Sequence, residues 1–217
     1  MKILVLGAAR TGTTYTMQTI ANKYKCKFIQ EPWNVANPEN YKPDLDLNKL
    51  PKKIVVKTMI DQFPPIHKAG KSLSPYSSDE QIISTNIDFL TKLVKLFDKV
   101  VLLYRSNTVE TYESLIYKFF RQKNINNNNW HGTYYFEKDK IPFNKEKYNF
   151  VIRNNVIVKK LSKDLGIPLT YYENLFSGYE DIVQKEINKW DLDIDILPSD
   201  FDNSFKLRKY SPVKKLL

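Results

Sequence analysis

The sequence is poor in the residues from which disulfides and metal centres are built. It has one cysteine, Cys26, which excludes an internal disulfide framework and a cysteine-based zinc site. Its only histidines, His67 and His131, lie in predicted loops, and two histidines without an acidic cluster give no metal site. We therefore expect a protein that requires no metal and suits a reducing compartment.

Long apolar runs are also missing. No run approaches the ~18 residues of a membrane span. The short apolar run at 3–6 is followed by Arg10, so it is too short for the apolar region of a signal peptide. The sequence thus predicts a cytoplasmic protein with no membrane span, and it leaves the oligomeric state open.

Acidic residues are outnumbered by basic ones. The chain has 24 Asp and Glu against 34 Lys and Arg, a formal net charge of +10. This excess favours anionic partners such as phosphate esters, nucleic acid, acidic polysaccharide or a lipid surface, and it does not choose among them. With 42% hydrophobic residues over 217 positions, the chain has globular composition and the size of one domain, which we expect to span 1–217.

Short apolar runs alternate with segments of helical periodicity. Four runs predict buried strands, at 3–6, 54–56, 100–104 and 167–172. Helices are predicted from Thr13, from the capping-box pairs at 77–81 to 97, from Asn107 to 120, at 150–165 and at 182–190. Segments 31–51 and 123–130 are predicted loops. This alternation predicts an α/β fold, a single domain with a central parallel sheet flanked by helices.

A glycine-bearing turn follows the first predicted strand. Gly7-Ala8-Ala9-Arg10-Thr11-Gly12-Thr13-Thr14 has the spacing of a phosphate-binding loop, with Thr13 where the lysine belongs. Backbone N–H groups and threonine hydroxyls at a helix N-terminus can hold a 5′-phosphate. Without the lysine that reaches β- and γ-phosphates, ATP or GTP hydrolysis is disfavoured. The alternative is a βα turn that binds no ligand.

This loop resembles that of the sulfotransferases that use 3′-phosphoadenosine 5′-phosphosulfate (PAPS). Their 5′-phosphosulfate loop usually reads Pro-(Lys/Arg)-Ser-Gly-Thr-Thr, and residues 9–14 differ from it at Ala9 and Thr11. The resemblance implies a P-loop-like sulfotransferase fold. It also implies that the donor's 5′-phosphosulfate is bound by Arg10, Thr11, Gly12, Thr13 and Thr14.

A second motif of the family is a strand that ends in arginine, with a serine in the next helix. Here these residues are Arg105 and Ser114, at a spacing that resembles the bacterial and phage members. The resemblance implies that both hold the 3′-phosphate, and a guanidinium at a strand end suits bidentate pairing. The alternative is that Arg105 makes a surface ion pair and Ser114 is an exposed helix residue.

Two further segments resemble the family less specifically. Tyr171-Tyr172-Glu173-Asn174-Leu175 is similar to its Tyr-Glu-Asp-Leu segment, which implies that Tyr172 lies near the adenine; a core tyrosine is the alternative. The basic run 206–211, with Arg208 and Lys209, resembles the segment that closes over the 3′-phosphate. A solvated charged tail explains that run equally well.

Sulfuryl transfer needs a base for the acceptor's proton and cations near the leaving oxygen. Animal members end a strand in Lys-Thr-His, where this chain has Lys57-Thr58-Met59, and methionine cannot accept a proton. Glu31 resembles the carboxylate base of a bacterial branch, so we expect Glu31 as base, with Arg10 and Lys57 supplying charge. The alternatives for Glu31 are a solvated loop residue, or a base supplied by one of the two histidines.

These residues favour one function over two others. The resemblance implies transfer of a sulfuryl group from PAPS to a hydroxyl or amine by in-line displacement, releasing adenosine 3′,5′-bisphosphate (PAP). The acceptor, a small molecule or a glycan, has no recognisable code. A P-loop-type kinase is the enzymatic alternative. A basic nucleic-acid- or polyanion-binding module with a vestigial loop comes third, because aromatic and basic residues interleave at 117–123; we do not expect nucleic acid as a partner.

Overall fold

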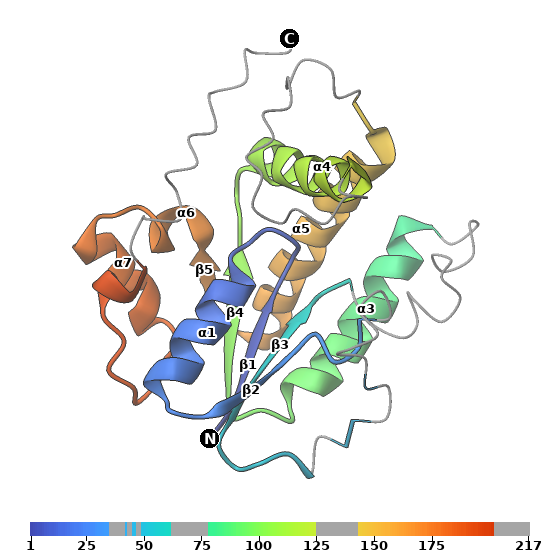
Figure 1. The fold of residues 1–217 in the computed structure, drawn as a ribbon. Helices are drawn as coiled ribbons and strands as arrows, with labels where there is room; N and C mark the ends of the chain where they lie inside the picture. The colour runs from blue at the N-terminus through green and yellow to red at the C-terminus, as the bar shows by residue number, and fades with distance from the viewer. Residues whose placement is uncertain (35–41, 43–44, 47–48, 62–77, 125–142, 202–217) are drawn as a thin grey trace.

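A five-stranded parallel sheet organises the protein (Figure 1). The computed structural model describes residues 1–34, 42, 45–46, 49–61, 78–124 and 143–201. The strands are β1 (Lys2–Gly7), β2 (Lys27–Gln30), β3 (Ile54–Met59), β4 (Lys99–Tyr104) and β5 (Leu169–Tyr171). Their order is β2-β3-β1-β4-β5 and every neighbouring pair is parallel, so all carboxyl ends meet at one edge.

Helices cover both faces of the sheet. They are α1 (Thr13–Lys23), α3 (Asp79–Val94), α4 (Thr108–Asn124), α5 (Lys145–Leu165), α6 (Tyr172–Leu175) and α7 (Glu180–Asn188), with a 3₁₀ turn at Pro198–Phe201. One core packs α3 and α5 on the sheet, and the other packs α1 and α7 on the opposite face. None of the helices in the described segments is long and apolar enough to cross a membrane.

The central strand β1 explains why the apolar runs are continuous. Leu4 and Leu6 pack in the core under α3 and α5, whereas Ile3 and Val5 pack in the core under α1. A strand that is buried on both faces needs apolar side chains at every position. The predicted α/β class, with a central parallel sheet flanked by helices, is thus confirmed and is consistent with a P-loop-like fold. The boundary 1–217 stays a prediction.

Several predicted helix ends are also confirmed. Ser78 begins α3 with a complete capping box, because its hydroxyl accepts from Gln81 N and its own N–H donates to the Gln81 side chain. Asn107 caps α4, since its Oδ1 accepts from Glu110 N at 3.1 Å. Gly166 ends α5 in the left-handed conformation, with φ 66°. Local hydrogen bonds therefore fix these boundaries.

Several details of the predicted elements are wrong. The helix predicted to reach 97 ends at Val94, and the helix predicted at 182–190 covers Glu180–Asn188. The sequence predicts four strands, and β2 was missed because this edge strand is short and Phe28 is 45% exposed. The predicted strand 167–172 is shorter in the structure, because Tyr172 begins the helical turn α6. The helix α4 continues to Asn124, past the predicted start of the 123–130 loop.

Candidate functional site

The loop between β1 and α1 has a tightly constrained backbone. Arg10 and Gly12 both adopt left-handed conformations, with φ 69° and 80°. A Cβ on Gly12 would lie 2.8 Å from Phe176 Cε2, and a Cβ on Gly7 would lie 2.7 Å from Thr11 Oγ1. Thr11 Oγ1 itself donates to Ala8 O at 2.7 Å. Both glycines are therefore required by close packing, which supports the loop geometry predicted from the motif.

The loop leads into a helix whose N-terminus lacks a side-chain cap. Gly12 occupies the N-cap position of α1 and makes no side-chain hydrogen bond, and the first turn carries no acidic residue. By contrast, Ser78 caps α3 and Asn144 caps α5. Amide groups in the first turn of a helix have no acceptor within the helix, so an uncapped N-terminus favours an anion. The Thr13 hydroxyl turns toward β3, where it donates to Met59 Sδ at 3.7 Å.

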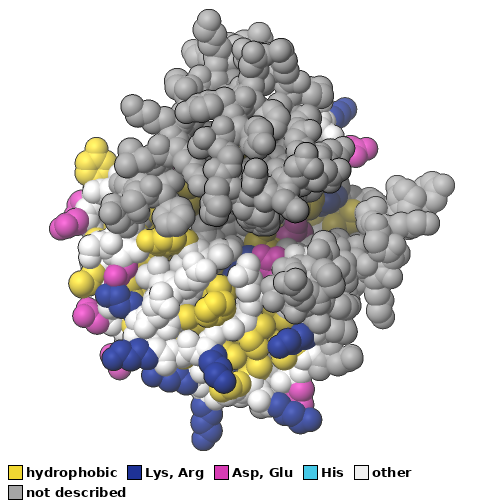
Figure 2. Space-filling model, in the orientation of Figure 1, with side chains coloured by type: hydrophobic (Ala, Val, Ile, Leu, Met, Phe, Trp, Pro, Cys, Tyr) yellow, Lys and Arg dark blue, Asp and Glu magenta, His cyan; other side chains and the backbone are white. Residues whose placement is uncertain are grey.

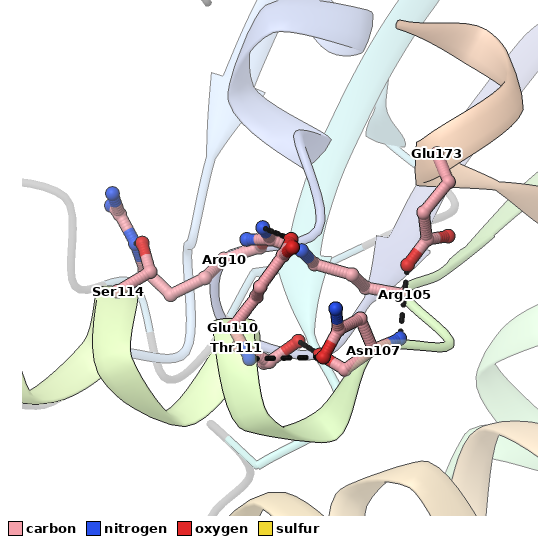
Figure 3. Close-up of polar contacts among 7 residues, drawn as sticks. All are labelled: Arg10, Arg105, Asn107, Glu110, Thr111, Ser114 and Glu173. Atoms are coloured by element: carbon pink, nitrogen blue, oxygen red, sulfur yellow. Dashed lines mark hydrogen bonds and ion pairs between the residues drawn. The ribbon is translucent and has the colours of Figure 1, made fainter. Parts of the chain in front are cut away.

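The two sequence motifs meet at one hydrogen bond. Arg10 Nε donates to Ser114 Oγ at 2.8 Å, across 104 positions of sequence (Figure 3). Strand order makes this contact possible, since β4 lies directly beside β1 and leads into α4. Ser114 is 7% exposed, which excludes the alternative that it is an exposed helix residue.

Arg105, which follows β4, contacts three groups of the site. Its Nη2 pairs with Glu110 Oε2 at 2.8 Å, and its Nη1 donates to the backbone oxygen of Arg10 at 3.4 Å. Its Cζ lies 4.5 Å from the centre of the Tyr172 ring. Its Nε is buried and has no hydrogen-bond partner among the described residues. The alternative interpretation was that Arg105 makes a surface ion pair. It does make an ion pair, but its side chain is only 12% exposed and also contacts the loop between β1 and α1.

Two N–H groups at the start of α4, those of Asn107 and Glu110, already donate to protein side chains. Asn107 N donates to Glu173 Oε1 at 3.0 Å, and the Thr111 hydroxyl donates to Asn107 O at 2.8 Å (Figure 3). Glu173 is the residue after Tyr172, so α6 supplies this carboxylate. An anion at Arg105 would therefore be bound by side chains rather than by these backbone groups.

Tyr172 lies between an arginine and another ring. Arg105 contacts one side of the tyrosine, and the Phe176 ring centre lies 4.8 Å away. Tyr172 is partly exposed, at the carboxyl end of β5. The predicted ring contact therefore lies at the same edge of the sheet as Arg105.

Glu31 and Lys57 form a buried ion pair on the other side of the loop. The Lys57 ammonium contacts Glu31 Oε1, and the two side chains are 2% and 12% exposed. Asn34 Nδ2 donates to Glu31 Oε2 at 2.6 Å, and Glu31 N donates to Lys57 O at 2.7 Å. Because strand side chains alternate, Lys57 lies on the same face as Val55, under α1. Glu31 is thus not the solvated loop residue of the alternative interpretation.

Some predicted residues lie outside the described part of the chain. They are His67, His131, Arg208, Lys209 and the capping residue Ser77. Most of the segment 31–51 also lies outside it. Within the described ranges, no three His, Cys, Asp or Glu side chains are grouped as a metal site requires.

Sequence reasoning missed three side chains that contact the predicted ones. They are Asn34 on Glu31, Glu110 on Arg105 and Glu173 at the start of α4. Two of them carried a signal. Glu110 stands three residues after Asn107, as a capping partner does, and Glu173 lies in the segment 171–175 that resembles Tyr-Glu-Asp-Leu.

Figure 2 shows part of the basic surface. On the face in Figure 2, the described lysines and arginines lie mainly in the lower part of the view, toward the end of the molecule where β1 begins. The predicted site residues follow the opposite ends of the strands. No family model and no curated protein sequence matches the chain, so the functional assignment rests on the residues and their geometry.

Proposed function

We propose that the protein is a PAPS-dependent sulfotransferase that transfers a sulfuryl group to a hydroxyl or amine and releases PAP. The observation that supports this most is the hydrogen bond from Arg10 Nε to Ser114 Oγ, with Arg105 donating to Arg10 O. The 5′-phosphate and 3′-phosphate motifs of the resemblance are far apart in sequence and adjacent in space.

The residues present fit the implied cofactor. The Nε of Arg105 is buried and has no partner in the described ranges, which suits an oxyanion, and the uncapped N-terminus of α1 suits a second one. In this proposal the loop 10–14 would hold the 5′-phosphate, Arg105 and Ser114 the 3′-phosphate, and Tyr172 the adenine. Arg208 and Lys209 would add charge over the 3′-phosphate. When bound, PAPS supplies the activated sulfuryl group.

The chain's own residues then accept the acceptor's proton and stabilise the negative charge on the leaving oxygen. Glu31 accepts the proton of the acceptor hydroxyl, while Asn34 orients its carboxylate through the hydrogen bond at Oε2. Lys57 and Arg10 provide positive charge near the leaving oxygen. Both oxygens of Glu31 already accept hydrogen bonds, so the acceptor hydroxyl must share or displace one of these donors.

Ligand binding tests the proposal directly. PAP should raise the melting temperature, and ATP with magnesium should not, because a ligand that binds only the native state stabilises it. Arg105→Ala should weaken PAP binding by about 1.5–3 kcal/mol, measured by calorimetry at fixed salt. Lys160→Ala removes a half-exposed charge on α5 and serves as the control.

The opposite results point to the alternatives. An unchanged dissociation constant in Arg105→Ala would overturn the 3′-phosphate assignment. Stabilisation by ATP with magnesium but not by PAP would favour a kinase. Steeply salt-dependent nucleic-acid affinity that PAP does not reduce would favour the binding module.

A further inference from the structure

The guanidinium of Arg105 has one edge that is only half used. In arginine, the N–H of Nε and one N–H of Nη2 point the same way, at a spacing that matches two oxygens of a phosphate or carboxylate. Here Glu110 Oε2 accepts from Nη2 at 2.8 Å, while Nε is buried and has no partner within the described part of the chain. This edge of the guanidinium therefore binds one carboxylate oxygen, although a phosphate or carboxylate could place two oxygens on it.

Glu110 pairs with Arg105 instead of completing a capping box at the start of α4. The pattern Asn107-x-x-Glu110 predicts a capping box, in which the Glu110 side chain accepts from Asn107 N. At α3 the equivalent box, Ser78 with Gln81, is complete. At α4 the first half forms, but Glu173 accepts from Asn107 N and the Glu110 carboxylate turns to Arg105. A departure from a local rule is most often found at functional sites.

The contact between Glu110 and Arg105 is easily displaced. The Glu110 side chain is 55% exposed, whereas the Arg105 side chain is 12% exposed. Solvent screens an ion pair with one partner so exposed, so the pair holds together only weakly. The helix cap does not depend on it, because Asn107 makes the capping hydrogen bond to Glu110 N through its own side chain.

We infer that Glu110 is an internal competitor for the Nε–Nη2 edge of Arg105, where the proposed function places the nucleotide's 3′-phosphate. This inference rests on the proposed function, because it takes the anion to be the 3′-phosphate of PAPS and PAP. A phosphate carries about −1.5 to −2 charges and offers three oxygens, so it outcompetes a single carboxylate oxygen. Its binding must still displace Glu110, which lowers the net affinity.

Glu110 thereby sets how strongly the protein distinguishes nucleotides with a 3′-phosphate from those without one. Removing its charge should tighten PAP and leave adenosine 5′-phosphate unaffected, because the latter has no group for this edge. The carboxylate also favours release of PAP, since it can take back its place on Nη2 as the phosphate leaves.

The test is calorimetric titration of PAP and of adenosine 5′-phosphate into the wild type, Glu110→Gln and Glu110→Ala. We expect both variants to lower the PAP dissociation constant about 3- to 10-fold and to change that of adenosine 5′-phosphate by less than about 2-fold. Asp88→Asn, which removes an exposed carboxylate from α3, is the control and should change neither.

Each other outcome identifies what failed. Unchanged or weaker PAP binding in both Glu110 variants, with weaker binding in Arg105→Ala, would show that Glu110 orients the arginine rather than competes; the proposed function would stand. An equal decrease in the dissociation constants of both nucleotides would show that Glu110 acts only through its overall charge, and this would overturn the inference. Binding of neither nucleotide by the wild type would overturn the proposed function, and the inference with it.

Discussion

Two lysine–carboxylate pairs lie at opposite edges of the same sheet. Glu31 pairs with Lys57 of β3, and Asp191 pairs with Lys99, the first residue of β4. Both carboxylate residues adopt a left-handed backbone, with φ 50° at Glu31 and 49° at Asp191. The pairs differ in burial: the side chains of the first are 2% and 12% exposed for lysine and carboxylate, and those of the second 32% and 87%.

The difference in burial supports the proposed role of the first pair. Exposed pairs contribute little to stability, whereas removing two charges from water is expensive and is often not repaid by their attraction. A buried pair is thus better explained by a functional role than by a contribution to stability. The Glu31–Lys57 pair follows the carboxyl ends of β2 and β3, where parallel sheets bind ligands. Arg10, in the loop between β1 and α1, is a further left-handed residue at that edge, and such conformations cluster at functional sites.

The largest expected effect is on turnover at the buried pair. Glu31→Gln keeps the size of the side chain and an acceptor for Lys57, but it cannot take a proton. Turnover should fall about 10²- to 10⁴-fold with PAP affinity retained, measured with labelled PAPS and an acceptor found by screening.

Stability must be separated from catalysis in that experiment, because Glu31→Gln leaves the Lys57 charge buried. The double variant Glu31→Gln with Lys57→Met removes both charges, so it should recover much of the lost stability without recovering turnover. Normal turnover in Glu31→Gln, with loss in His67→Ala or His131→Ala, would assign the base to a histidine instead.

The next effect is on stability and compares the two lysines. Lys57→Met leaves Glu31 buried without its cation and should lower the free energy of unfolding by about 3–5 kcal/mol in urea titrations. Lys99→Met removes the matched lysine at the other edge and should change it by less than about 1 kcal/mol. Equally small changes in both variants would show that burial does not distinguish the pairs.

Two glycines extend the comparison to the backbone. Gly12, in the loop, and Gly166, before β5 begins, both have positive φ. A Cβ on Gly12 would meet Phe176 at 2.8 Å, whereas one on Gly166 would have nothing within 4 Å. Gly166→Ala should therefore lower the free energy of unfolding by only about 1–2 kcal/mol, because alanine is less stable than glycine in the left-handed conformation. Gly12→Ala should cost about 1–3 kcal/mol more, from overpacking. Equal losses in thermal unfolding would contradict the close packing at Gly12.

Much of the fold is predictable because its determinants are local. Continuous apolar runs predict strands such as β1, and side-chain hydrogen bonds at Ser78 and Asn107 fix helix starts within a few residues of sequence. The edge strand β2 could not be predicted in the same way. It has one neighbour, β3, and its first residues are exposed, so its sequence lacks a long apolar run.

The candidate site depends on contacts that no local pattern contains. The bond from Arg10 to Ser114 requires β4 to lie beside β1, and the Glu31–Lys57 pair requires β2 to align with β3. The cap at Asn107 shows how tertiary structure overrides a correct local pattern. Its predicted partner Glu110 is replaced by Glu173, which is 66 residues away from Asn107.

The smallest expected effect is a pH dependence at the exposed pair. The hydrogen bond from Lys99, followed by its charge, lowers the pKa of Asp191 below the usual 3.8, and the slight burial of the carboxyl opposes this. A carboxyl whose pKa is lower in the folded state adds stability above its unfolded pKa and loses it as pH falls through the folded one. Lys99→Met should therefore return the pKa of Asp191 toward 3.8 in an NMR titration. It should also make the free energy of unfolding less dependent on pH below about pH 4. An unchanged pKa would mean that the two side chains do not stay together in solution, and only the buried pair would then count as a lasting ion pair.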